Sequence, residues 1–89
     1  MKTIMGLYMH NLHEEKKAFW DYIELLNCET HKDRKSIWYA IAADELQHFV
    51  KIKETVWSEM TEHTEMEQAF YHELHEEYEA MKKCLEKHK

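Results

Sequence analysis

Proline is absent from this sequence of 89 residues, and glycine occurs only once, at Gly6. Tight turns between strands usually draw on glycine, proline, asparagine and aspartate at special backbone angles. A chain so poor in the first two is not expected to form a sheet. Glu, Lys, Leu, Met and Ala, which are good helix formers, dominate instead. The composition predicts a single all-α domain over residues 1–89, with long helices and short polar connections.

An excess of positive charge is also missing. The 12 Lys and Arg residues are outnumbered by 18 Asp and Glu, which gives a net charge of −6 with histidine neutral. Such an acidic chain is not expected to have nucleic acid or an anionic membrane as its main partner. No apolar run approaches the roughly 20 residues that cross a bilayer. The N-terminal residues lack the apolar stretch and cleavage site of a secretory signal.

Cysteine is scarce, since only Cys28 and Cys84 are present. Their spacing fits neither a metal site nor a disulfide framework. We therefore expect free thiols in a reducing, cytoplasmic protein, and a Cys28–Cys84 disulfide is the less favoured alternative.

Three helices are predicted from apolar spacing and from helix-start signals. They are expected at about residues 7–27, 33–60 and 65–87. Thr30 followed by Asp33 resembles the start of the second helix, with the acid favouring the positive end of the helix dipole. Thr64 and Glu67 have the spacing of a capping box, which predicts the start of the third helix.

Each predicted helix has an apolar stripe with alternating steps of three and four residues, as in helix bundles. The first stripe is Tyr8, Leu12, Phe19, Tyr22 or Ile23, and Leu26. The second stripe is Trp38, Ile41, Glu45, His48, Ile52 and Val56. The third stripe is Phe70, Leu74, Tyr78, Met81 and Leu85. Glu15 fills the gap in the first stripe, so the inner faces of the first two helices are expected to carry Glu15, Glu45 and His48.

Two arrangements of these helices are open. One is a three-helix bundle. The other is an antiparallel hairpin of the first two helices that dimerises into a four-helix bundle, with the third helix packed outside or exchanged. Polar groups on the two inner faces, with many aromatic residues around them, favour the second arrangement.

Glu45 and His48 have the spacing of a shared ligand site. Residues three apart on a helix are separated by about 60° in azimuth and about 4.5 Å in rise, so both side chains can reach one point. Glu15 lies about as far before the first connection as Glu45 lies after it, which places the two at similar height in an antiparallel hairpin. Carboxylate oxygens together with an imidazole nitrogen suit iron and manganese. A metal site of Glu15, Glu45 and His48 is therefore predicted.

A second copy of the chain would complete such a site. Three ligands leave a metal incompletely coordinated, and buried polar groups without a cation are costly. A two-fold partner doubles the set to four carboxylates and two imidazoles, which suits two metal ions with the Glu45 pair well placed to bridge. Bundle proteins with two metals use this inventory, in which two helices each give one Glu and two give Glu-x-x-His.

The segment 42–48, Ala-Ala-Asp-Glu-Leu-Gln-His, resembles the Glu-x-x-His helix of the ferritin-like superfamily, which includes rubrerythrins and ferritins. One Glu helix and one Glu-x-x-His helix per chain is similar to encapsulated ferritins, which complete a ferroxidase site across a dimer of two-helix hairpins. The resemblance covers the first two helices and implies roles for three residues. Glu15 would be a terminal or chelating ligand, Glu45 a bridging ligand and His48 a terminal nitrogen ligand.

The resemblance also implies a reaction, a cofactor and partners. The reaction would be oxidation of Fe(II) by dioxygen at two irons per homodimer or higher homo-oligomer, with manganese or zinc as alternative metals. A full ferritin-like chain carries two Glu-x-x-His motifs and this one carries a single motif, so dimerisation is required. An encapsulin-type shell is a further partner of such proteins, but the sequence gives no support for it, because no obvious targeting tail follows Cys84.

Several other residues are weaker candidates. Glu14 is the rival of Glu15 and is expected to line an entry route or to contact the ligands. Tyr22 and Tyr39, with Trp20 and Trp38, are expected near the metal or in packing. Two histidine pairs are also spaced to share a metal, although surface pairs of this kind are more often solvated. These pairs are His72 with His75, and His10 with His13.

Two other functions compete with the di-iron hypothesis. One is a non-catalytic helical interaction protein whose buried polar residues specify the oligomer. The other is a zinc-sequestering protein that uses surface histidines.

Overall fold

The computed structural model describes residues 3–89 and shows three helices and no strand in that range, which confirms the all-α class. The helices are α1 (Ile4–Cys28), α2 (Lys32–Glu59) and α3 (Glu65–Glu86). Helix α1 begins earlier than expected because Thr3 caps it, its hydroxyl accepting a hydrogen bond from the Gly6 N–H at 3.0 Å. None of the helices in the described range combines the length and hydropathy needed to cross a bilayer.

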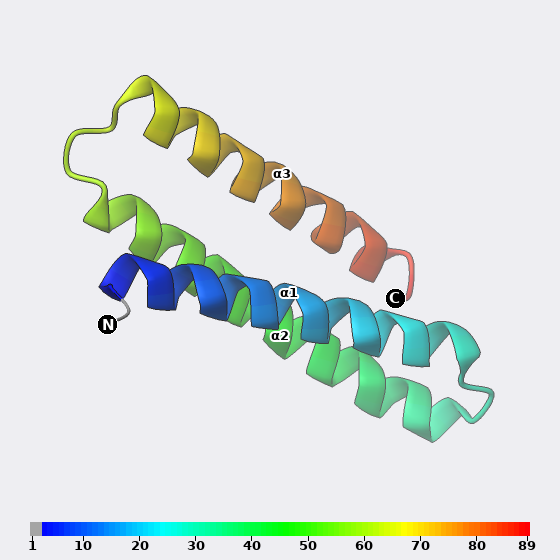
Figure 1. The fold of residues 1–89 in the computed structure, drawn as a ribbon. Coiled ribbons are helices and arrows are strands. Elements are labelled where there is room, and N and C mark those ends of the chain that lie inside the picture. Colours follow the sequence, from blue (N-terminus) through cyan, green and yellow to red (C-terminus); the bar gives the residue numbers. More distant parts are fainter. Residues whose placement is uncertain (1–2) are drawn as a thin grey trace.

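Helices α1 and α2 form an antiparallel hairpin, and α3 returns along α2 after a second connection (Figure 1). Helix α3 packs chiefly against α2 and approaches α1 near one ion pair, Lys16 Nζ to Glu77 Oε1 at 3.1 Å. The Cα atoms span 48 × 28 × 15 Å, so the chain is flattened rather than cylindrical. The hairpin with α3 packed outside it is therefore the arrangement of the single chain.

The core lies where the three helices meet. Its buried apolar residues are Leu12, Phe19, Ile23, Leu26, Ala42, Leu46, Phe49, Val56, Met60, Leu74, Met81 and Leu85. Phe19 and Phe49 are fully inaccessible to solvent and hold α1 against α2. The predicted stripes of the first and third helices largely match these positions, with Phe70 and Tyr78 half-buried beside them.

The buried face of α2 differs from the predicted one. Its buried residues are Ala42, Leu46, Phe49, Lys53 and Val56, and of these only Val56 belongs to the predicted stripe. The prediction that Glu45 and His48 lie on the most buried face of α2 is wrong for the single chain, since the His48 side chain is 53% exposed. The physical reason is that α2 packs against both α1 and α3. This packing buries the residues that follow the predicted ones by one position, such as Leu46 after Glu45 and Phe49 after His48.

Glu29 organises the connection between α1 and α2. One carboxylate oxygen accepts hydrogen bonds from the backbone N–H groups of Thr30 and His31, each at 3.2 Å. The other accepts from Arg34 Nε and from Trp38 Nε1, each at 3.0 Å. Hydrogen bonds from Trp38, Arg34 and the His31 backbone lower the pKa of Glu29 to about 2.

The helix-start predictions had different outcomes. Helix α2 has Asp33 in its first turn as predicted, but its cap is His31, without a side-chain hydrogen bond, rather than Thr30. The capping box of α3 is confirmed, because the Thr64 hydroxyl accepts from the Glu67 N–H and the Glu67 carboxylate accepts from the Thr64 N–H.

Candidate metal centre

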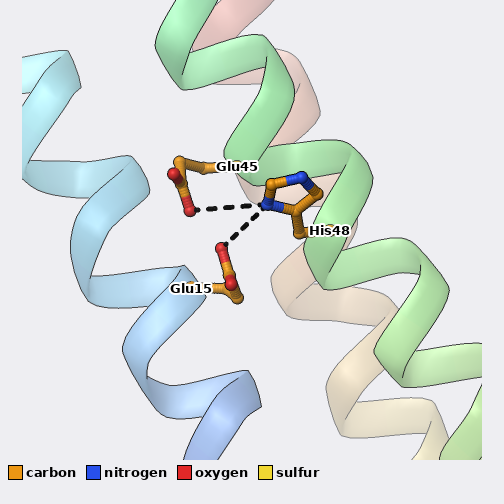
Figure 2. Close-up of side chains that lie close together, drawn as sticks. All are labelled: Glu15, Glu45 and His48. Atoms are coloured by element: carbon orange, nitrogen blue, oxygen red, sulfur yellow. Dashed lines mark ion pairs between the residues drawn. The ribbon is translucent and has the colours of Figure 1, made fainter.

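Glu15 from α1 meets Glu45 and His48 from α2 between the two helices of the hairpin (Figure 2). His48 Nδ1 lies 3.4 Å from Glu15 Oε2 and 4.0 Å from Glu45 Oε2. One ligand atom from each residue lies within 4.8 Å of the others. Among the residues that the structure describes, this is the one group of three or more His, Cys, Asp or Glu gathered so closely.

The hairpin positions these side chains through the packing on either side of them. On α1, Glu15 lies between buried Leu12 and Phe19. On α2, Glu45 and His48 are three residues apart, next to buried Leu46 and Phe49. Because all three residues sit in helix interiors rather than in connections, the distance between their backbones is fixed by the packing of α1 on α2.

The exposure of the three side chains is graded. Glu45 is 20% exposed, Glu15 25% and His48 53%. The Oε2 atom of Glu15 is fully buried and has no hydrogen-bond partner, since the contact to His48 does not have hydrogen-bond geometry. A buried acceptor without a donor costs about 1–3 kcal/mol. A cation or a proton between the side chains would remove that cost.

The proximity of the carboxyl groups raises the pKa of Glu45 to about 7. The main cause is the close approach to Glu15, to which Glu45 would donate a hydrogen bond when protonated, and burial and the Glu15 charge add to it. His48 lowers the pKa and Asp44 raises it. The cluster is therefore short of positive charge. A divalent cation with oxygen and nitrogen ligands fits both the unpaired oxygen and the crowded carboxyl groups.

The cluster lies on a face of the hairpin that α3 does not cover, since α3 passes behind α2 in Figure 2. Helical spacing places apolar side chains on either side of it. We call the whole set the open face: Tyr8, Glu15 and Tyr22 of α1 with Ile37, Ile41, Glu45, His48 and Ile52 of α2. Tyr8, Tyr22, Ile41 and Ile52 are half-buried, and Ile37 is 51% exposed. The cluster is thus bordered by apolar surface that the chain itself leaves accessible.

The other predicted site residues are spread over the molecule. Glu14 is exposed beside Glu15 and is not part of the group. Tyr22 stacks on Trp38, with ring centroids 6.2 Å apart, two turns along α1 from Glu15. Tyr39 packs against the core and lines a cavity near the α1–α2 connection, in agreement with the packing alternative.

The histidine pairs lie away from the cluster. His10 and His13 are exposed on α1. His72 and His75 are exposed on α3, where each is paired with a glutamate one turn further on.

Sequence reasoning missed two polar residues that the fold uses. Glu29 holds the first connection, and Lys53 is 3% exposed with its Nζ donating to Glu54 Oε1 at 2.7 Å and to Tyr71 Oη at 3.0 Å. Burial lowers the pKa of Lys53, but its hydrogen bonds to Glu54 and Tyr71 outweigh this effect, so the net shift of the pKa is upward. The spacing of Lys53 after Leu46 and Phe49 was the available signal for its burial.

Comparisons with known proteins add no assignment to this geometry. No family model matches the chain, and no curated protein or solved structure matches it significantly. The resemblance of the α2 segment to the ferritin-like superfamily stays a prediction.

Proposed function

We propose that two copies of this chain join through the open face to form a di-iron site that oxidises Fe(II) with dioxygen. The observation that carries the proposal is the convergence of Glu15, Glu45 and His48, whose ligand atoms lie within 4.8 Å of one another beside a buried, unpaired Glu15 oxygen. Mixed carboxylate and imidazole ligands are suited to iron, and manganese or zinc at the same ligands is the alternative.

The need for a second copy follows from the donor set. One chain offers two carboxylates and one imidazole, which leaves a metal short of ligands. His48 is half exposed, and the apolar residues of the open face are partly accessible to solvent, so a second copy could pack against them. A two-fold dimer would bring four carboxylates and two imidazoles together, which is the inventory of two-metal helix bundles. Packing of the two open faces would also bury Ile37, Ile41 and Ile52.

The residues of the chain would have distinct tasks in this reaction, in which Fe(II) is the substrate. Bound iron supplies the electrons that reduce dioxygen. Glu15 and Glu45 would hold the metals and neutralise their charge, and His48 would give a neutral nitrogen ligand. Glu45 must lose its proton for the metal to bind, so its raised pKa means that metal affinity falls as the pH drops below about 7. The rigid frame of α1 and α2 would keep the ligands in place as the iron charge changes.

The test is an anaerobic titration of metal-free protein with Fe(II), with stoichiometry and particle mass measured together. Wild type, Glu45→Ala and Glu24→Ala are compared, because Glu24 is an exposed glutamate on α1 outside the cluster. We expect two irons per dimer in wild type and Glu24→Ala, oxidation when air is admitted, and loss of binding in Glu45→Ala. If the wild-type protein does not bind Fe(II) tightly and its oligomeric state does not change, the proposal is wrong.

One observation favours a second function, that of a helical interaction protein without metal. A proton shared between Glu15 and Glu45 would satisfy the crowded carboxyl groups by itself. In that case the open face would bind a helical partner and the buried polar pair would specify the match. Indifference of the thermal stability to Fe(II) and to chelators would favour this function, whereas a metal protein gains stability from its metal.

A further inference from the structure

A second group of histidines gathers at the junction of α2 and α3, away from the open face. His63 from the connection and His72 and His75 from α3 line one cavity of about 500 Å³. Its remaining lining residues are Trp57, Gln68 and Tyr71. The connection and α3 therefore bring three imidazoles to one cavity, beside Trp57 of α2.

His63 is held there by its backbone and by its ring. It has a φ of 48°, in the left-handed region that non-glycine residues seldom adopt. Its carbonyl accepts a hydrogen bond from Gln68 Nε2 at 2.6 Å. The imidazole lies flat on the Trp57 ring, with centroids 3.9 Å apart and planes 2° from parallel. A strained backbone that is fixed by several contacts marks a position whose side chain has a defined place.

All three imidazoles direct Nε2 at an acceptor. His63 Nε2 lies 3.3 Å from the Trp57 carbonyl oxygen. The Nε2 atoms of His72 and His75 lie 2.9 Å from Glu76 Oε1 and 3.5 Å from Glu79 Oε1. A neutral imidazole that donates from Nε2 has its lone pair on Nδ1. Many metal-binding histidines hold the second ring nitrogen on a backbone carbonyl or a carboxylate, as His63 does on the Trp57 carbonyl.

We propose that His63, His72 and His75 bind a borderline divalent cation such as Zn²⁺ through Nδ1. Three nitrogen donors distinguish this site from the oxygen-rich cluster of Glu15 and Glu45, and imidazole-rich sets suit zinc, copper and nickel. The proposal does not depend on the proposed di-iron function.

The surroundings of the cavity suit a cation. Glu54 Oε1 accepts hydrogen bonds from both Lys53 and Tyr71, and these bonds lower its pKa, so Glu54 stays a carboxylate. The same bonds fix Tyr71 in the wall of the cavity. The charge of Glu54 is balanced by Lys53, so the negative charge beside the imidazoles comes from Glu76 and Glu79.

Binding requires the three rings to come closer together. Their donor atoms are not grouped as tightly as those of Glu15, Glu45 and His48. The side chains of His72 and His75 are 70% and 47% exposed, so both can change rotamer without disturbing the core. His63, stacked on Trp57, is the fixed member toward which the other two would turn.

The test is a Zn²⁺ titration of full-length protein at pH 7.5, in a Glu45→Ala background that removes the other cluster. Affinity and stoichiometry are measured against a chromophoric chelator. We expect one Zn²⁺ per chain, with affinity reduced about tenfold or more by each of His63→Ala, His72→Ala and His75→Ala. Helical content is compared by circular dichroism, and all three variants are expected to match their parent.

A double variant, His10→Ala with His13→Ala, is the matched control, since those residues have the same spacing on α1 but no third histidine. It is expected to bind Zn²⁺ as its parent does. Cu²⁺ gives an independent readout, because quenching of tryptophan fluorescence should be lost in Trp57→Phe. Zinc affinity unchanged by His63→Ala, or lost equally in the His10 and His13 control, would overturn the proposal.

Discussion

The two sides of the α1–α2 hairpin differ in how far the rest of the chain covers them and pairs their polar groups. On one side α3 supplies Leu74, Met81 and Leu85 to the core, and Lys53 donates to Tyr71 across the α2–α3 contact. On the open face, isoleucines and tyrosines remain accessible around a cluster that contains an unpaired buried oxygen. One side is thus satisfied within the chain, and the other has both apolar surface and polar groups without partners. The difference teaches that the α3 contacts of the core and the candidate metal cluster lie on different sides of one hairpin.

Removing the α3 contact should have the largest effect on stability. Met81 is fully buried, and Met81→Ala is expected to lower the free energy of unfolding by about 2–5 kcal/mol through lost burial and a cavity. Chemical denaturation followed by circular dichroism measures the change. Met66→Ala is the control, because Met66 is 84% exposed at the start of α3. A loss below 1 kcal/mol would mean that the packing of α3 contributes little to the free energy of unfolding.

The pH dependence of the stability of the metal-free protein should report the protonation of Glu45 on the open face. The pKa of Glu45 rises from 4.5 to about 7 on folding, so the folded chain binds more protons than the unfolded chain between those values. The stabilisation is therefore complete below pH 4.5 and is lost as the pH rises through 7, by up to about 3 kcal/mol.

Denaturation midpoints between pH 4.5 and 8, for wild type and Glu45→Gln, measure that loss. The glutamine variant cannot titrate, so its contribution should disappear, whereas Glu24→Gln should keep the wild-type profile. Identical pH profiles for wild type and Glu45→Gln would show that the two carboxyl groups do not share a proton.

A charge on the open face should have the smallest effect on the fold. Ile37 is 51% exposed, so Ile37→Glu is expected to change the free energy of unfolding of the monomer by about 0.5 kcal/mol or less. The same charge should weaken a dimer formed through this face. Sedimentation of Ile37→Glu and of Met66→Glu, whose change lies on α3, separates the two effects. Equal self-association of both variants and wild type would exclude the open face as the contact between copies.

The fold could be predicted from the sequence where the signals are local. The Thr64–Glu67 capping box depends on residues three apart, and it was found correctly. The all-α class followed from composition in the same way. The rotation of α2 could not be found locally, because Trp38–Val56 and Ala42–Lys53 both have helical spacing and only the packing of α1 and α3 selects the second.

The candidate site was predicted in part for the same reason. Glu45 and His48 are neighbours on any helix, and the antiparallel hairpin brings Glu15 to their level, so the grouping is visible in the sequence. Their exposure, the unpaired Glu15 oxygen and the cavity at His63 depend on side-chain packing and backbone angles that no spacing encodes.

The connection between α1 and α2 spans only residues 29–31, and Glu29 holds it closed. Closing so short a loop costs little chain entropy. Because the connection is short, Glu15 is separated from Glu45 and His48 by only a modest length of sequence. None of the hydrogen bonds or ion pairs of these three residues involves α3. The contacts among the three candidate ligands therefore lie entirely within the α1–α2 hairpin, while α3 affects them only through the rotation of α2.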